Sequence, residues 1–278
     1  MTAMHRDLVD LDVRVEGSGP PLLLVHGALC DGQLWDGVVA RLRDRFTCIV
    51  PQMPLGSHRR PLPAGADRSP AGHAARLAAL VDALGTGPVT LVGNDSGGAI
   101  CQVLAAEHAD RVERLILTNC DALDVFPPPA YAYLGLVTRI PGAFAAMALA
   151  LNALPVLARF PTAYGWLADR LDSALLRSWI APLRDPAVRA DTAAFFRDVH
   201  PRVTLRAARQ LARGRVPVHL LWGERDPFFR VSLAERLAAE VGATLDRLDA
   251  RTYVPLDAPG ALADHIGALA ARAARTTA

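Results

Sequence analysis

The segment from Val89 to Gly98 constrains the fold more than any other part of the chain. It reads VTLVGNDSGG, an apolar run followed by a glycine-flanked turn and then by a sequence compatible with a helix. In a sharp turn from a strand into a helix, the central residue is held in strained backbone geometry, so the residues two before and two after it must be small. Gly93 and Gly97 meet this condition around Asp95. The segment therefore predicts a strand-turn-helix elbow with Asp95 at its tip.

Two alternatives to this interpretation are weaker. If Ser96 were at the tip, Asn94 would occupy the first small position, although Gly98 would suit the second. Asp95 could also be a simple helix cap, because an aspartate at a helix start stabilises the exposed N–H groups and the helix dipole. Capping alone requires neither flanking glycines nor a strand that leads in. We therefore treat Asp95 as a candidate reactive group.

Predicted strands and helices alternate on both sides of the elbow. Continuous or alternating apolar runs predict strands, and apolar residues at helical spacing predict helices. The predicted strands are 8–16, 21–25, 46–50, 89–92, 112–118, 218–222 and 244–248, and the predicted helices are 31–45, 70–84, 97–108, 231–241 and 259–275. Short connections between these elements indicate an α/β fold, with a mostly parallel twisted sheet and helices on both faces.

The pattern changes after Asp121. Three consecutive prolines, 127–129, open a long Ala- and Leu-rich helical stretch with further prolines, and the strand pattern returns at Val216. We expect one core formed by residues 1–121 and 216–278, with residues 122–215 inserted as a helical cap. A length of 278 residues suits a single α/β unit with such an insertion.

Charge and composition exclude several classes of function. Hydrophobic residues make up 51% of the chain, which is ample for a large core. The 30 basic and 28 acidic residues give a net charge of +2 without a long run of one sign. Such a balance predicts neither a nucleic-acid nor a membrane partner. A small molecule is the partner that we expect, and the sequence is silent on the oligomeric state.

No cofactor is predicted. The four cysteines are widely separated and form no C-x-x-C pair, so we expect reduced, mostly buried thiols and no metal site. Nucleotide and flavin motifs are absent from the sequence. The first residues lack an apolar signal segment, and the apolar stretch after Gly142 is interrupted by Asn152 and Pro155. We therefore expect a cytoplasmic protein.

Four segments together resemble the α/β-hydrolase superfamily, and the resemblance covers nearly the whole chain. They are HGAL at 26–29, the elbow, the insertion, and LWGERD at 221–226. The resemblance implies that Asp226 is the acid of a catalytic triad, and that the N–H groups of Ala28 and Ser96 form an oxyanion hole. An aspartate at the elbow is similar to the haloalkane dehalogenase and epoxide hydrolase branches, in which the carboxylate attacks carbon to form an ester.

The chain departs from those branches in two parts of the sequence, around the elbow and near the C-terminus. They usually carry a tryptophan after the nucleophile and a proline in the His-Gly-x-Pro loop, where this chain has Ser96 and Leu29. Halide stabilisation by an indole is therefore not expected. Near the C-terminus, the segment ARTYVPLDAP places Thr252 where the resemblance implies the catalytic histidine. Threonine cannot accept a proton near neutral pH, so ester hydrolysis would need another base.

Other residues are candidates for the base and for the pocket. His58, in the loop after the strand 46–50, is the first candidate for a relocated base, and His200 at the end of the cap is the second. The residues that we expect in or beside the substrate pocket are His26, Leu29, Thr252, Tyr131 and Trp166. His26 is expected to support the oxyanion loop, and the cap aromatics have packing as their alternative role.

Three functions remain in competition. The first is an enzyme that uses Asp95 as a general acid/base on a small hydrophobic substrate without hydrolysing it, by cyclisation, elimination, isomerisation or intramolecular epoxide opening, as in natural-product chemistry. A helix N-terminus lowers the pKa of a carboxyl whereas burial raises it, so a pKa nearer neutrality is possible. The second is an epoxide hydrolase-like enzyme with Asp95 as nucleophile and His58 as base. The third is a catalytically inactive small-molecule-binding protein.

Overall fold

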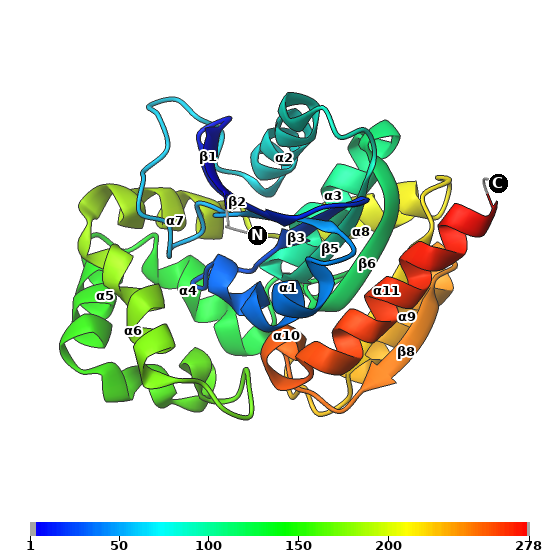
Figure 1. Ribbon diagram of the computed structural model, residues 1–278. Helices are drawn as coiled ribbons and strands as arrows, with labels where there is room; N and C mark the ends of the chain where they lie inside the picture. Colours follow the sequence, from blue (N-terminus) through cyan, green and yellow to red (C-terminus); the bar gives the residue numbers. More distant parts are fainter. Residues whose placement is uncertain (1–3, 277–278) are drawn as a thin grey trace.

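A twisted eight-stranded sheet forms the centre of the computed structural model, which describes residues 4–276 and the side chains of residues 8–270 (Figure 1). Its spatial order is β1-β2-β4-β3-β5-β6-β7-β8. The strands are β1 (Met4–Leu8), β2 (Leu11–Gly17), β3 (Pro21–Val25), β4 (Thr47–Pro51), β5 (Val89–Asp95), β6 (Val112–Cys120), β7 (Val218–Gly223) and β8 (Thr244–Leu248). β2 pairs antiparallel with β1 and β4, and the other neighbours are parallel.

Helices cover both faces of the sheet, and each face has its own apolar core. On one face lie α1 (Asp36–Leu42) and α11 (Pro259–Thr276), which stand in front of the sheet in Figure 1. The other face carries α2 (Pro70–Leu84), α3 (Ser96–Glu107), α8 (Pro201–Leu211) and α9 (Val231–Val241). The parallel strands β3, β5 and β6 are buried on both faces, which explains their continuous apolar sequences. The predicted α/β fold is confirmed.

Most predicted elements lie where the sequence places them, with two differences in the core. The single strand expected over 8–16 is a hairpin of β1 and β2, because Val9 and Asp10 adopt positive φ angles of 48° and 62° and reverse the chain. The short helix α10 (Val254–Asp257) was not expected and follows Tyr253 directly. Its four residues are too few for a helical period to stand out in the sequence.

The insertion lies beside the end of the sheet at which β5 stops, on the left of Figure 1. It contains α4 (Ala132–Val137), α5 (Ala143–Ala153), α6 (Ser173–Ile180) and α7 (Pro186–Asp198), joined by short 3-10 and π-helical turns. Helix α8, which the sequence assigns to the cap, instead packs against α3 and α9 in the core layer. The cap therefore ends near residue 200, because the apolar face of α8 is buried against α3.

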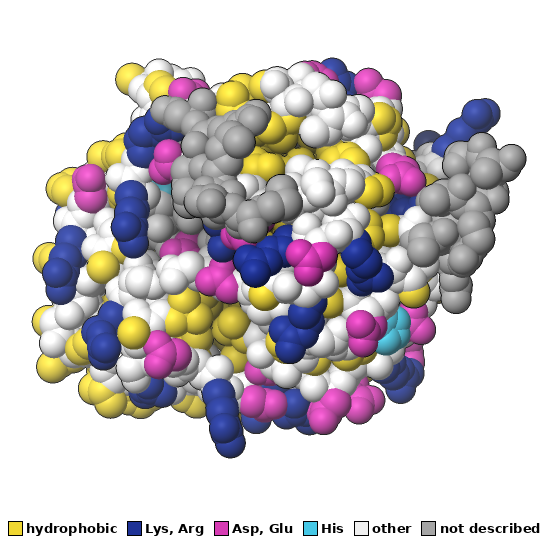
Figure 2. Space-filling model, viewed as in Figure 1, with side chains coloured by type: hydrophobic (Ala, Val, Ile, Leu, Met, Phe, Trp, Pro, Cys, Tyr) yellow, Lys and Arg dark blue, Asp and Glu magenta, His cyan; other side chains and the backbone are white. Residues whose placement is uncertain are grey.

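The surface is mixed in charge. On the face in Figure 2, arginine and acidic side chains are interspersed. Large exposed apolar side chains of the described residues all belong to the cap, and some are visible along the left edge of Figure 2. They are Tyr133, Leu136, Ile140, Leu149, Leu154, Val156, Phe160 and Trp166. Within residues 4–276, no helix is both long and apolar enough to cross a membrane.

A substitution at Gly97 tests how tightly the elbow is packed. A Cβ atom at Gly97, the second residue of α3, would lie 2.3 Å from the backbone oxygen of His26. We expect Gly97→Ala to lower the free energy of unfolding by about 1–3 kcal/mol, because the opposing atom belongs to the backbone and cannot turn aside. Urea denaturation measures the change.

Gly260 is a matched control because it is the second residue of α11. A Cβ atom there would meet only Arg41 Nε, at 3.6 Å. Gly260→Ala should leave stability unchanged or raise it by up to about 1 kcal/mol through helix propensity. Equal effects of the two substitutions would contradict the tight elbow.

Candidate active site

Asp95 stands at the junction of β5 and α3. Its backbone angles, φ 53° and ψ −135°, lie in a region that non-glycine residues rarely adopt. The strain is held by close contacts on both sides: a Cβ at Gly93 would lie 2.7 Å from the Cα of Gly98, and a Cβ at Gly97 would strike the His26 carbonyl. The glycine spacing read from the sequence thus has a direct steric cause, and Asp95 occupies the tip.

The Asp95 carboxylate faces two backbone donors. The N–H groups of Ser96 and Ala28 both hydrogen-bond to it. Beyond Ser96, the first residue of α3, its side chain makes no capping hydrogen bond to that helix, so it does not act as an ordinary N-cap. Burial raises the pKa of Asp95 to about 7, against the lowering effect of the two N–H groups, and the nearby Asp226 adds to the rise. Both protonation states are therefore populated near neutral pH.

The loop after β3 presents the Ala28 N–H group to Asp95. At Gly27 a Cβ atom would lie 2.2 Å from Asp95 Oδ2, so only glycine allows this approach. Leu29 has a φ of 59°, and its N–H group donates to Leu55 O at 3.0 Å. The hydroxyl of Tyr164 donates to Leu29 O at 2.6 Å, which ties the loop to the cap.

His26 supports this loop from below and does not line the cavity. Its Nε2 accepts the N–H of Met53 at 2.9 Å, so Nδ1 carries the proton and donates to Gly27 O at 2.8 Å. Full burial lowers the pKa of His26 to about 4. The expectation of His26 beside the substrate is therefore corrected: the ring is neutral and holds the backbone that faces Asp95.

A cavity of about 360 Å³ lies between the core and the cap, above Asp95. This volume is at the small end of the range for sites that bind small organic molecules. Apolar side chains make up most of its wall. The residues that line it are Ala28, Leu29, Asp95, Ser96, Asp121, Phe126, Pro127, Pro128, Tyr131, Tyr133, Leu134, Met147, Ala150, Leu151, Leu157, Phe160, Thr162, Ala163, Tyr164, Leu167, Phe196, Val199, Phe229 and Tyr253.

The cap tyrosines are hydrogen-bonded within the protein. Tyr131 donates to Ala163 O at 3.0 Å, Tyr133 donates to Thr162 O at 3.0 Å, and Tyr164 is bonded to the oxyanion loop. Tyr131 lines the cavity, as predicted. Trp166, by contrast, is 48% exposed and lies outside the cavity, with its ring tilted against Phe228. The prediction for Trp166 is corrected: its side chain points away from the cavity, whereas the next residue, Leu167, is buried and lines it.

Asp226 keeps a complete set of partners without a histidine. Its carboxylate accepts Asn119 Nδ2 at 2.9 Å and the backbone N–H groups of Phe228 and Phe229 at 2.7 and 3.1 Å. Burial raises the pKa of Asp226, against these hydrogen bonds and the nearby Thr252 hydroxyl. Thr252 is fully buried and outside the cavity, and its own hydroxyl oxygen has no partner at normal hydrogen-bond geometry. Its expected place in the pocket is therefore corrected.

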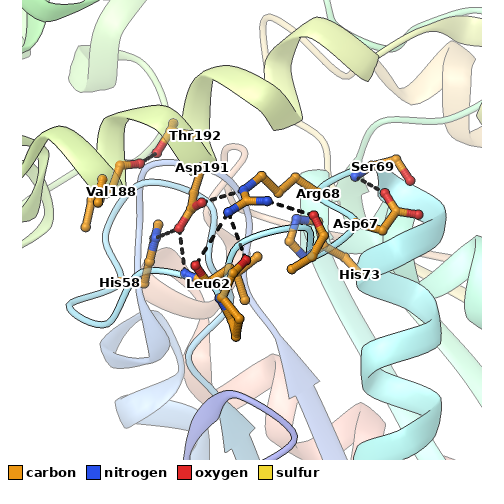
Figure 3. A network of polar contacts seen from close by, with 12 residues as sticks. His58, Leu62, Asp67, Arg68, Ser69, His73, Val188, Asp191 and Thr192 are labelled. Atoms are coloured by element: carbon orange, nitrogen blue, oxygen red, sulfur yellow. Dashed lines mark hydrogen bonds and ion pairs between the residues drawn. The ribbon is translucent and has the colours of Figure 1, made fainter.

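His58 does not reach Asp95. Figure 3 shows its ring turned toward Asp191 of α7, and Nε2 lies 3.2 Å from Asp191 Oδ2. Nδ1 accepts the N–H of Gly56 at 3.2 Å, so both ring nitrogens are occupied. Arg68 and the backbone N–H of Leu62 also bond to Asp191, and although burial raises the pKa of that carboxyl, these bonds together hold it below its usual value. The prediction of a relocated base at His58 is thus not supported by its geometry.

The other histidines that the structure describes are also away from the cavity. His200 caps α8, where its Nδ1 accepts the N–H of Arg202 at 3.1 Å, and is exposed. No described histidine side chain lines the cavity. Within the same part of the chain, no group of three or more His, Cys, Asp or Glu residues could hold a metal ion, and the four cysteines are buried and unpaired.

Sequence reasoning missed Asp121. It directly follows β6, is 1% exposed and is one of the residues that line the cavity. Ser96 Oγ donates to Asp121 Oδ2 at 3.0 Å. The position was readable as a polar residue at the carboxyl end of a buried strand next to the elbow strand, which is where ligand-binding residues gather in parallel sheets.

Comparison with known proteins is consistent with this architecture. Residues 20–258 match the family model described as alpha/beta hydrolase fold, and the chain belongs to that family of enzymes. Haloalkane dehalogenase 2 of Mycobacterium tuberculosis is 29% identical over 260 residues, with 89% of this chain and 87% of that protein covered. A cis-3-alkyl-4-alkyloxetan-2-one decarboxylase of Shewanella oneidensis is 27% identical, with 77% and 70% covered. The solved epoxide hydrolase CorEH shares the fold with a TM-score of 0.75 at 20% identity, over 95% of this chain and 96% of that chain.

The raised pKa of Asp95 makes stability depend on pH. A carboxyl whose folded pKa lies above its unfolded value takes up protons on folding, so its contribution to stability falls as the pH rises from about 4 to about 7. Asp95→Asn removes this penalty. The unfolding free energy of the variant minus that of the wild type should therefore be larger at pH 8 than at pH 5. We expect this difference to grow by at least about 1 kcal/mol, since one pKa unit corresponds to about 1.4 kcal/mol. Urea titrations at both pH values measure it, and parallel pH dependences would contradict the raised pKa.

The His58 network is expected to be structural. His58→Ala removes one hydrogen bond from the buried Asp191, which should lower the unfolding free energy by about 1–3 kcal/mol. His265→Ala on α11, at a more exposed site, should change it by less than about 0.5 kcal/mol. Turnover per folded molecule should be unchanged in both variants. A covalent adduct on Asp95 that accumulates only in His58→Ala, seen by intact-mass measurement, would restore His58 as the base.

Proposed function

We propose that the protein catalyses a non-hydrolytic proton-transfer reaction on a small hydrophobic substrate that contains oxygen, with Asp95 as the general acid/base. Cyclisation, elimination, isomerisation and intramolecular epoxide opening belong to this class. The single observation that carries the proposal is a carboxyl of pKa about 7 at the floor of an apolar cavity that no described histidine side chain lines. A group with this pKa exchanges protons readily at neutral pH.

The surroundings of Asp95 favour proton transfer over ester formation. An aspartyl ester is released only when a base activates water, and the residue beside Asp226 at the expected position is Thr252. Without such a base, nucleophilic attack would end in a stalled adduct. Proton transfer by Asp95 requires no second base, because Asp95 returns to its starting form when it gives up the proton.

The relatives lend support to the kind of substrate. One of them is named for decarboxylation of an alkyl-substituted oxetanone, a small oxygen ring, and another for dehalogenation of haloalkanes. Ser96 follows Asp95 directly, so no indole is available at that position for a halide. Two backbone N–H groups instead point at the reactive carboxyl. An apolar molecule with a strained ring oxygen suits this combination better than a haloalkane.

Product analysis in water labelled with oxygen-18 tests the proposal. The purified protein is incubated with alkyl epoxides, alkyl β-lactones and an alkyl bromide, and both the products and the intact protein are weighed by mass spectrometry. We expect an oxygen heterocycle to be converted without incorporation of solvent oxygen and with no mass added to the protein. Asp95→Asn should lower this turnover by at least about 100-fold, in line with loss of a general acid/base.

Other outcomes would each overturn the proposal in a different way. A main product that carries solvent oxygen would indicate an ordinary hydrolase, whereas a stable adduct on Asp95 would indicate a nucleophile without a base. Turnover that survives in Asp95→Asn would remove Asp95 from the mechanism. Tight binding without turnover, unchanged in Asp95→Asn, would indicate a binding protein.

A further inference from the structure

A second aspartate lines the cavity beside Asp95. In the sheet, Asp95 of β5 is the register partner of Cys120 of β6, and Asp121 is the next residue along the chain. Neighbouring strands lie about 4.8 Å apart, so the two aspartates leave adjacent strands at the same edge. Both line the cavity. The charge on Asp95 is also among the causes that raise the pKa of Asp121.

The contacts of Asp121 leave one oxygen without a partner. Oδ2 accepts the Ser96 hydroxyl at 3.0 Å, whereas Oδ1 has no hydrogen-bond partner although the residue is only 1% exposed. Burial raises the pKa of this carboxyl well above its usual range, so the neutral acid is the form that fits the site. Because Oδ2 already accepts a hydrogen bond, the proton belongs on Oδ1. A buried donor without an acceptor is costly unless a ligand supplies one.

The hydroxyl groups of Ser96 and of the three cap tyrosines at the cavity are already engaged. Ser96 donates to Asp121, and Tyr131, Tyr133 and Tyr164 all donate to backbone oxygens. The cap tyrosines therefore do not offer a free proton to a ligand in this arrangement. Asp121 combines a transferable proton, an unpartnered oxygen and a position on the cavity wall.

We propose that Asp121 is a second catalytic carboxyl, which donates the proton of Oδ1 to a substrate oxygen while Asp95 accepts a proton from the same substrate. This inference rests on the proposed function and deepens it. Environments that push the pKa values of two carboxyls apart are what separates an acid from a base in one site. The inference defines the substrate as an apolar molecule with one oxygen that becomes protonated and one hydrogen that is removed.

The step balances without water. A C–O bond of the substrate breaks, and its oxygen takes the proton from Asp121. Asp95 takes a proton from a C–H or O–H bond of the same substrate. The electron pair of that C–H or O–H bond forms the new bond within the substrate. The substrate is isomerised, Asp95 is left neutral and Asp121 ionised. Transfer of one proton from Asp95 to Asp121, through solvent after product release, restores the starting state. No oxidant, reductant or further reactant is consumed.

Binding of a carbonyl probe tests the hydrogen-bond donor. Acetophenone labelled with carbon-13 at the carbonyl is titrated with wild-type protein, Asp121→Ala and Asp121→Asn at neutral pH, and its carbonyl resonance is followed by NMR. We expect a downfield shift on binding to the wild type and to Asp121→Asn, whose amide also donates, and none with Asp121→Ala. Affinity should fall about fivefold or more in Asp121→Ala. An equal shift with Asp121→Ala, or no shift in the wild type, would overturn the inference.

Turnover separates proton transfer from hydrogen bonding. With whichever epoxide or lactone reacts, Asp121→Asn should lower kcat by at least about 100-fold and leave KM within about threefold, because the amide binds but cannot give up a proton. The control is Asp124→Asn, which removes the same charge three residues on, where Asp124 pairs with Arg236 at the surface. It should retain kcat within about twofold.

The two proposals fail in distinguishable ways. If Asp95→Asn abolishes turnover while Asp121→Asn retains it, Asp121 is only an acceptor for Ser96 and the proposed function stands. If Asp95→Asn retains turnover, the proposed function fails whatever Asp121 does. If none of the compounds reacts, the acetophenone titration still decides whether Asp121 donates into the cavity. Thermal unfolding of each variant checks that the fold is retained.

Discussion

Burial of the Asp95 carboxyl at the tip of the elbow is the constraint on which the rest of the site depends. Burial alone favours the neutral acid, and the N–H groups of Ser96 and Ala28 favour the anion, so the pKa settles at about 7. Moving either donor away would raise the pKa of Asp95 further, and opening the cap to solvent would lower it. The close packing of strand, loop and cap thus sets the chemistry that Asp95 can perform.

Much of the surrounding structure serves to hold those two donors in place. Gly27 and Gly97 permit backbone contacts that any side chain would block. Beneath the loop, a neutral His26 fixes the Gly27 carbonyl through one nitrogen and the Met53 N–H through the other. Above it, Tyr164 anchors the loop to the cap. His26, which the sequence was expected to place in support of this loop, is therefore part of the support for the reactive carboxyl.

Asp226, for which the resemblance implies the role of a triad acid, is held in place without a histidine partner among the described residues. Asp226 is held by Asn119 and two backbone N–H groups, and Thr252 lies beside it. A buried carboxylate with these donors is stable without a histidine. Its remaining effect on Asp95 is electrostatic, since its charge helps to raise the pKa of the elbow carboxyl.

The sequence by itself determined the fold class, the elbow and the place of Asp95 at its tip, because each follows from local rules, whereas Asp226 and the N–H groups of Ala28 and Ser96 were implied only by the family resemblance. Apolar runs mark strands buried on both faces, and glycine spacing marks a turn whose neighbours must be small. Tertiary structure alone decided which polar groups meet in the cavity. The His58 ring contacts Asp191, a partner 133 positions later in the chain, and so does not lie at the cavity. Asp121 lies beside Asp95 only because β5 pairs with β6. Contacts between residues far apart in the chain leave no periodicity or spacing to read, so the partners of a side chain become visible only once the sheet has assembled.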